Sequence, residues 1–119
     1  MKKLLIALFI LTFSTIALAR DINRITAPAT VSARAIAGAC LFYGITVMTD
    51  GTNNVTLNIY DNTAASGTRL IPTNFIIPGI DRYFGYKPPL PIRCTNGIYV
   101  SVSVAGGGTC SYQVLYDRG

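Results

Sequence analysis

The stretch GACLFYGITVMTDGTNNVTLNIYDNTAASGT, from Gly38 to Thr68, decides the fold class of this chain. Apolar and polar residues alternate through each half of it, and turn-forming residues at 49–54 separate the halves. Alternation with a period of two is typical of strands that bury one face. Asp50-Gly51 is a strong hairpin signal. The stretch therefore predicts two antiparallel strands, followed by a loop of turn formers at 61–67.

Strict alternation assigns a face to each residue of these strands. In the first strand it places Ala39, Leu41, Tyr43, Ile45 and Val47 on one face, and Cys40, Phe42, Gly44, Thr46 and Met48 on the other. In the second it places Val55, Leu57 and Ile59 inward and Thr56, Asn58 and Tyr60 outward.

The flanking segments extend the pattern. Small apolar residues at 31–37 are compatible with a first strand, and Pro72 demotes 68–77 to an edge strand or loop. Alternation returns at 98–104 and 109–116, with the three glycines 106–108 read as a hairpin tip between them. Short strands with Gly, Asn, Asp and Pro punctuation predict an all-β fold, an antiparallel β-sandwich of jelly-roll or immunoglobulin-like type.

The N-terminus reads as a processing signal. Lys2 and Lys3 precede an apolar run at 4–18, and Ala17-Leu18-Ala19 forms an A-x-A cleavage site. The rival interpretation is a retained membrane anchor, for which a run of 15 residues is short against the roughly 20 that cross a bilayer. We expect residues 1–19 to be a helical signal peptide, with no membrane attachment after cleavage and export to the periplasm or outside the cell.

Residues 20–119 then form a single domain, with 20–30 as an arm or edge segment. Their basic residues are scattered singly, so no nucleic-acid-binding surface is indicated. The chain has no His and no Glu, so acid–base chemistry near neutral pH would have to rely on Asp alone. Asp50 and Asp61 lie in turn clusters, where Asp typically caps backbone amides. We predict a protein that is not an enzyme and uses no cofactor or metal, since two turn aspartates are weak evidence for calcium.

Three cysteines in an exported chain predict one disulfide and a spare thiol. On the hairpin register, Cys110 faces about Ser103, roughly 30 Å from Cys94 at ~3.3 Å per residue. A disulfide needs Cα atoms within about 7 Å. We therefore prefer a Cys40–Cys94 bond, with three buried free thiols as the alternative.

The segment DRYFGYKPPLP, Asp81 to Pro91, is the best binding candidate. It sets the aromatic Tyr83, Phe84 and Tyr86 beside Arg82 and Lys87 on a proline-stiffened loop, and aromatic and Arg residues are common interface anchors. The alternative is that one or two of these rings cap the open end of the sandwich. The predicted outward residues Tyr60, Tyr99, Ser101 and Ser103 offer a second patch, or an ordinary solvated sheet face.

The motifs GACLFYGITV, VTLNIYDNTAASGTRL, IPGI and CTNGIYVSVSVAGG, in that order before a final strand ending in Tyr, cover about 37–116. Their arrangement resembles small β-sandwich structural proteins of tailed bacteriophages, which decorate heads or form necks and tail fibres. The resemblance implies a non-enzymatic, repeated virion part with no catalytic residues. The secretory signal departs from that pattern, since virion proteins assembled in the cytoplasm do not normally carry one.

The function we expect is protein–protein contact within a homo-oligomer or repeated assembly, through the 81–91 loop and an arm at 20–30 that adds a strand to a neighbour's sheet. The alternative is a secreted ligand-binding module that stacks carbohydrate on Tyr83, Phe84 and Tyr86. A small secreted inhibitor held by its disulfide is a third, minor class.

Overall fold

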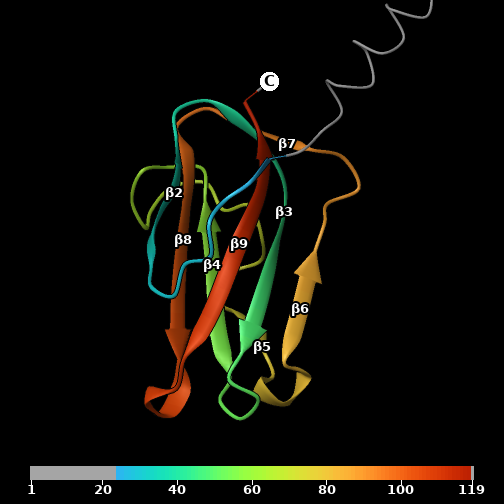
Figure 1. Ribbon diagram of the computed structural model, residues 1–119. Helices are drawn as coiled ribbons and strands as arrows, with labels where there is room; N and C mark the ends of the chain where they lie inside the picture. The colour runs from blue at the N-terminus through green and yellow to red at the C-terminus, as the bar shows by residue number, and fades with distance from the viewer. Residues whose placement is uncertain (1–23, 119) are drawn as a thin grey trace, which may run out of the picture.

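The computed structural model describes residues 24–118, and within them it has nine strands, two short 3-10 turns and no α-helix (Figure 1). In chain order the elements are β1 (Arg24–Ile25), β2 (Ala33–Ala37), β3 (Cys40–Thr49), β4 (Val55–Tyr60), β5 (Phe75–Ile77), η1 (Gly79–Asp81), β6 (Tyr83–Tyr86), β7 (Ile92–Cys94), β8 (Gly97–Val104), η2 (Ala105–Gly107) and β9 (Cys110–Asp117). Residues 24–118 include no helix of the length and apolar character needed to cross a membrane. The predicted signal peptide and its cleavage site lie outside the described residues.

The strands form two antiparallel sheets. Sheet A has the order β1-β9-β3-β6, with β7 also paired to β3, and sheet B has the order β2-β8-β4-β5. Strands β6 and β7 meet different parts of β3, so together they act as one interrupted edge strand. The all-β prediction is confirmed, and the two sheets are consistent with a β-sandwich.

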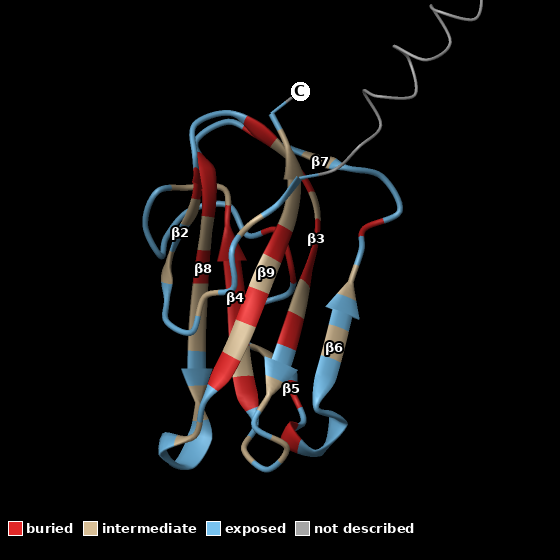
Figure 2. Ribbon diagram, in the orientation of Figure 1, coloured by how far each residue is buried: buried red, intermediate tan, exposed pale blue. Residues whose placement is uncertain are grey.

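Both sheets contribute side chains to one core (Figure 2). Every second residue of β4, β8 and β9 points into it, as the alternation predicts. The largest fully buried side chains are Phe42, Ile45, Leu57, Ile59, Ile77 and Ile98. Removing such apolar surface from water stabilises the fold by roughly 25 cal/mol per Å².

The two predicted hairpins are wrong. The turn at 49–54 joins β3 in sheet A to β4 in sheet B, and the glycines at 106–108 lead from β8 in sheet B to β9 in sheet A. Both are crossovers between the layers, because β9 pairs with β3 and β1 whereas β8 pairs with β2 and β4. The predicted position of Cys110 opposite Ser103 is wrong for the same reason.

The predicted faces of β3 are also wrong. Cys40 and Phe42 are buried together with Ile45 and Val47, although strict alternation separates these pairs. The pairing of β3 with β9 shifts between Phe42 and Gly44, which marks a β-bulge. One extra residue in a strand reverses the phase of all residues after it, so both halves of β3 face the core.

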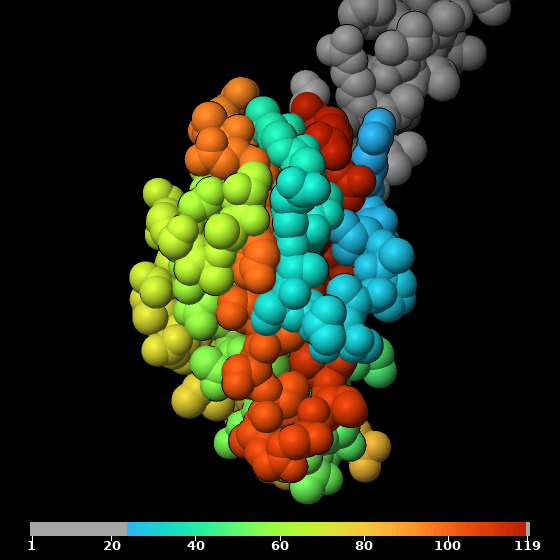
Figure 3. All heavy atoms as spheres, turned by 90° about the vertical axis from the view of Figure 1, so that its left-hand side faces the viewer, coloured from blue at the N-terminus to red at the C-terminus, as the bar shows by residue number. Residues whose placement is uncertain are grey.

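Residues 61–74 lie beside β4 (Figure 3), and Leu70 and Ile71 in this segment reach the core. Arg69 forms a β-bridge with Tyr60, and its guanidinium carbon lies 5.3 Å from the centre of the Tyr60 ring. Nearby, Asn58 accepts a 2.8 Å hydrogen bond from the backbone N–H of Asn74 and donates one of 3.1 Å to its side-chain oxygen. Tyr60 is therefore only 7% exposed, and its predicted place in an exposed patch is wrong. The predicted edge character of 68–77 is confirmed by β5.

The described part of the arm, 24–30, lies against its own domain. Strand β1 pairs with β9, and the backbone of Ala29 exchanges hydrogen bonds with that of Tyr112. The Tyr112 hydroxyl donates to the carbonyl of Val31 at 2.6 Å. Ile25 is 61% exposed, so hydrogen bonds of the main chain and side chains contribute more to holding the arm than burial of this residue does.

Candidate functional site

The predicted binding loop contains a strand. Residues 83–86 form β6, which pairs with Met48 to Ile45 of β3 and lies at the outer edge of sheet A. Tyr83 and Gly85 face outward, while Phe84 and Tyr86 are half-buried against the core. The structure thus divides the three aromatic residues of the predicted site between the two sides of one edge strand, with Tyr83 outside and Phe84 and Tyr86 inside.

On the inner side, aromatic rings from the two sheets meet. The ring of Phe84 on β6 lies 5.0 Å, centroid to centroid, from the ring of Phe75 on β5, and the rings are tilted by 39°. Beside this pair an apolar cavity of about 200 Å³ opens between the sheets. Its lining consists of Ile45, Leu57, Ile71, Pro72, Phe75, Phe84 and Tyr86. Phe84 and Tyr86 therefore close this side of the core, as the capping interpretation predicts, and line an apolar groove.

On the outer side, Tyr83 is the most prominent side chain. It is 59% exposed, and its hydroxyl lies 3.1 Å from where a Cβ at residue 85 would stand, so the ring covers Gly85. Its cross-strand partner Met48 is also exposed. A shallow hollow of about 160 Å³ adjoins Tyr83 on the side of Ser111 and Gln113, and another of about 210 Å³ adjoins it on the side of Lys87 and Leu115. We call this outer surface of β6 and its neighbours the Tyr83 face.

Arg82 and Lys87 flank β6 at its two ends, and both are exposed. The Arg82 carbonyl accepts a 2.8 Å hydrogen bond from the backbone N–H of Thr49, and its guanidinium lies next to Gly51. Arg82 also has a positive φ of 57°, uncommon for a residue with a side chain. The two cationic side chains lie at opposite ends of β6.

The aspartates in the turns are used to hold backbone, as the sequence predicts. The Asp50 carboxylate accepts hydrogen bonds from the N–H groups of Thr52, Asn53 and Thr109, and these bonds lower its pKa. Asp61 accepts from the N–H groups of Thr95 and Asn96. Asp50 thus joins the two crossovers 49–54 and 105–109, while Asp61 joins β4 to the turn before β8. No group of three or more metal-ligating side chains occurs within 24–118.

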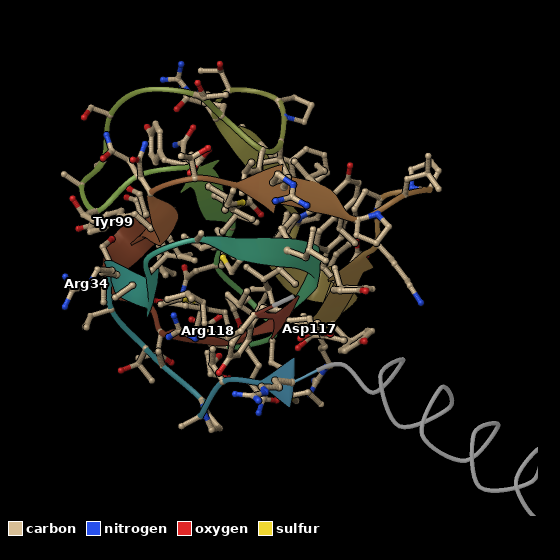
Figure 4. The ribbon with its side chains drawn as sticks, turned by 90° about the horizontal axis from the view of Figure 1, so that it is seen from above. Arg34, Tyr99, Asp117 and Arg118 are labelled. Atoms are coloured by element: carbon tan, nitrogen blue, oxygen red, sulfur yellow. The ribbon has the colours of Figure 1, made fainter. Side chains whose placement is uncertain are left out.

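The predicted second patch loses Tyr60, which is buried, and its remaining residues Tyr99, Ser101 and Ser103 lie on β8. Tyr99 is half-buried and pairs with Arg34 across β2 and β8. Figure 4 shows these two side chains together at one flank of the molecule, with Asp117 and Arg118 nearer the middle of the same view. Because Tyr60 is buried, the predicted patch presents only one tyrosine, Tyr99.

Two residues of the site were missed by the sequence interpretation. Phe75 lies three residues after Pro72, in a segment whose pattern predicts only an edge strand or loop, and Met48 occupies an ordinary alternating position. The aromatic residue directly before an Ile-Ile-Pro-Gly turn is the one available signal for Phe75. Nothing in the chain's local pattern indicates that β5 and β6 meet.

No family model, curated protein or solved structure matches this chain.

Proposed function

We propose that this chain is an exported, non-enzymatic subunit of a repeated protein assembly, of the kind that decorates or connects the parts of a virion. The observation that carries the proposal is the edge at β6, where the Tyr83 face lies outside and the apolar groove beside Phe84 lies inside. Tyrosine and neighbouring apolar residues are typical interface anchors. We also infer a β-sandwich of jelly-roll or immunoglobulin-like type, supported by connections that repeatedly change sheet.

An open edge strand is a binding element in itself. Strand β6 pairs with β3 on one side, and no other strand among residues 24–118 pairs with it. Unpaired N–H and C=O groups at such an edge accept an extended segment from another chain. A segment added there would place alternate side chains over the groove and over the Tyr83 face.

Charge favours a particular geometry of assembly. If β6 strands of two copies paired with each other antiparallel, Arg82 of one copy would lie opposite Lys87 of the other. Like charges directly opposite each other destabilise a strand pair. We therefore expect a head-to-tail contact, in which β6 of one copy meets a different surface of the next, as repeated assemblies require.

The test is self-association of the purified protein, measured by light scattering across a wide concentration range. We expect oligomers whose size increases with concentration, and we expect Tyr83→Asp to abolish them. Tyr99→Asp is the matched control, since it adds the same charge at a half-buried tyrosine on the other sheet. A protein that stays monomeric throughout, or loses association equally in both variants, would contradict the proposal.

The alternative is a carbohydrate-binding module. Of the three predicted stacking residues, only Tyr83 keeps its ring exposed enough to stack a sugar, and Ser111 and Gln113 beside it offer hydrogen bonds. Phe84 and Tyr86, the other two predicted stacking residues, face the core. Glycan binding that is lost in Tyr83→Ala, in a protein that remains monomeric, would favour this function.

A further inference from the structure

Two of the three cysteines are direct neighbours on paired strands. Cys40 opens β3 and Cys94 closes β7, and the register makes them Cα partners. Both are buried, and the Cys94 thiol donates a 3.7 Å hydrogen bond to the carbonyl of Ile92. All three cysteines are free thiols in the structure.

The spacing of this pair suits a disulfide. Opposed residues of an antiparallel pair have Cα atoms about 4.5 or 5.5 Å apart, depending on the hydrogen-bonding position. Disulfides span Cα separations of about 4.4–6.8 Å. A bond between Cys40 and Cys94 therefore fits within the existing strand pairing.

The backbone around both cysteines is already held in place. Gly38 donates its N–H to the carbonyl of Asn96, and Asp61 accepts from the N–H groups of Thr95 and Asn96. Arg118 donates to the carbonyl of Ala37 at 2.5 Å, at the end of the molecule that Figure 4 looks onto. Because these bonds fix the chain before Cys40 and after Cys94, closing the disulfide costs little further ordering.

The third cysteine is too far away to compete. Cys110 pairs with Thr49 at the opposite end of β3 from Cys40. Nine residues of strand at ~3.3 Å each separate these ends, which is about 30 Å. Exchange of partners would require unpairing β3 from β9. Cys110 is buried, and burial raises the pKa of its thiol, which keeps it in the unreactive form.

We propose that Cys40 and Cys94 form the disulfide of this protein under oxidising conditions and that Cys110 remains a thiol. The co-reactant is a disulfide oxidant, such as oxidised glutathione or a protein dithiol oxidase. One cysteine, as thiolate, attacks the oxidant's S–S bond and forms a mixed disulfide. The second cysteine then attacks the protein sulfur of that mixed disulfide and releases the oxidant's second thiol. The two cysteines lose two electrons and two protons, which leave the oxidant as two thiols.

The folded surroundings determine when this reaction occurs. Burial raises the pKa of the Cys94 thiol to about 12, so the attacking thiolate is scarce once β7 has docked on β3. We therefore expect fast oxidation during folding and slow exchange afterwards. The same burial protects the finished bond from reduction.

The test is the number of free thiols, measured as the number of alkylated cysteines by mass spectrometry. Full-length protein, reduced and unfolded, is refolded in oxidised and reduced glutathione, then unfolded again with an alkylating reagent and no reductant. We expect one alkylated cysteine in the wild type and three after prior reduction. Cys110→Ser should show none before reduction, and Cys40→Ser should show two. Three alkylated cysteines in the refolded wild type, or two in Cys110→Ser, would overturn the proposal.

A second measurement does not require Cys40→Ser to fold, because it uses only a variant that keeps both Cys40 and Cys94. The melting temperature of Cys110→Ser is compared with and without reductant, and we expect it to fall by roughly 10 °C or more when the bond is reduced. An unchanged melting temperature would overturn a structural disulfide. Because refolding in glutathione does not depend on export, failure of this test is distinguishable from failure of the proposed function.

Discussion

The rings of Phe75 and Phe84 join the two sheets at their open edge. Their centroids are 5.0 Å apart, and each ring belongs to the outermost strand of its own sheet. Aromatic pairs at this separation contribute about 0.5–1.5 kcal/mol beyond the area they bury. The pair therefore holds β5 and β6 in place and also forms one wall of the apolar groove.

Replacing Phe84 with alanine should lower the free energy of unfolding by about 2 kcal/mol, since a half-buried ring and its partner contact are lost. Tyr83→Ala, one residue away but outward-facing, should change it by less than about 1 kcal/mol. Urea unfolding of both variants measures the difference. Equal losses would contradict the opposite orientations of these neighbours.

The strands with clean alternation could be predicted because each has one face on the core throughout its length. This holds for the inward residues Val55, Leu57 and Ile59 of β4 and for those of β8 and β9. The prediction of an all-β chain with short strands rests on the same signal.

Strand pairing could not be predicted in the same way. Asp50-Gly51 and the glycines at 106–108 supply turn chemistry, and a crossover between sheets needs the same backbone freedom as a hairpin. Asp50 binds the N–H groups of both connections, a long-range relationship that no local pattern contains. The contact between Phe75 and Phe84 is hidden for the same reason.

The Asp50 carboxylate should make stability depend on acid pH. Its hydrogen bonds hold its pKa below the ordinary value of about 4. A carboxyl with a lowered folded-state pKa contributes stability above its unfolded pKa, and that contribution is lost as the pH falls towards the folded value. The stability advantage of the wild type over Asp50→Asn should thus be constant above about pH 5 and shrink below about pH 4.

Guanidinium unfolding across this pH range measures the difference between the two proteins. Asp81→Asn serves as the control, because it removes an exposed carboxylate on another loop. A wild-type advantage that stays constant down to pH 2 would show that the Asp50 hydrogen bonds do not depend on its charge.

The buried amide of Asn58 should be more important than its neighbours on the same face of β4. It is 9% exposed and makes two hydrogen bonds with Asn74. Asn58→Ala should lower the unfolding free energy by about 1–2 kcal/mol, because the loop at 72–74 loses its attachment. Thr56→Ala, two residues earlier on that face, should cost about 0.5 kcal/mol. Urea unfolding tests this ranking, and equal costs would contradict it.

The bulge in β3 depends on a residue without a side chain. Gly44 has φ of 153°, and a Cβ there would overlap the carbonyl oxygen of Tyr86. That oxygen belongs to the backbone of β6, so it cannot move aside without disturbing the edge strand. Gly44→Ala should therefore lower the unfolding free energy by about 2–3 kcal/mol.

Gly107→Ala is the matched control for this substitution. Residue 107 also has a positive φ, of 70°, but a Cβ there meets nothing within 4 Å. It should cost only about 1 kcal/mol, the backbone penalty alone. Thermal unfolding of the two variants separates the steric contribution at Gly44 from the conformational one. If both alanines cost the same, β6 does not approach β3 closely at the bulge, and the description of this edge would have to change.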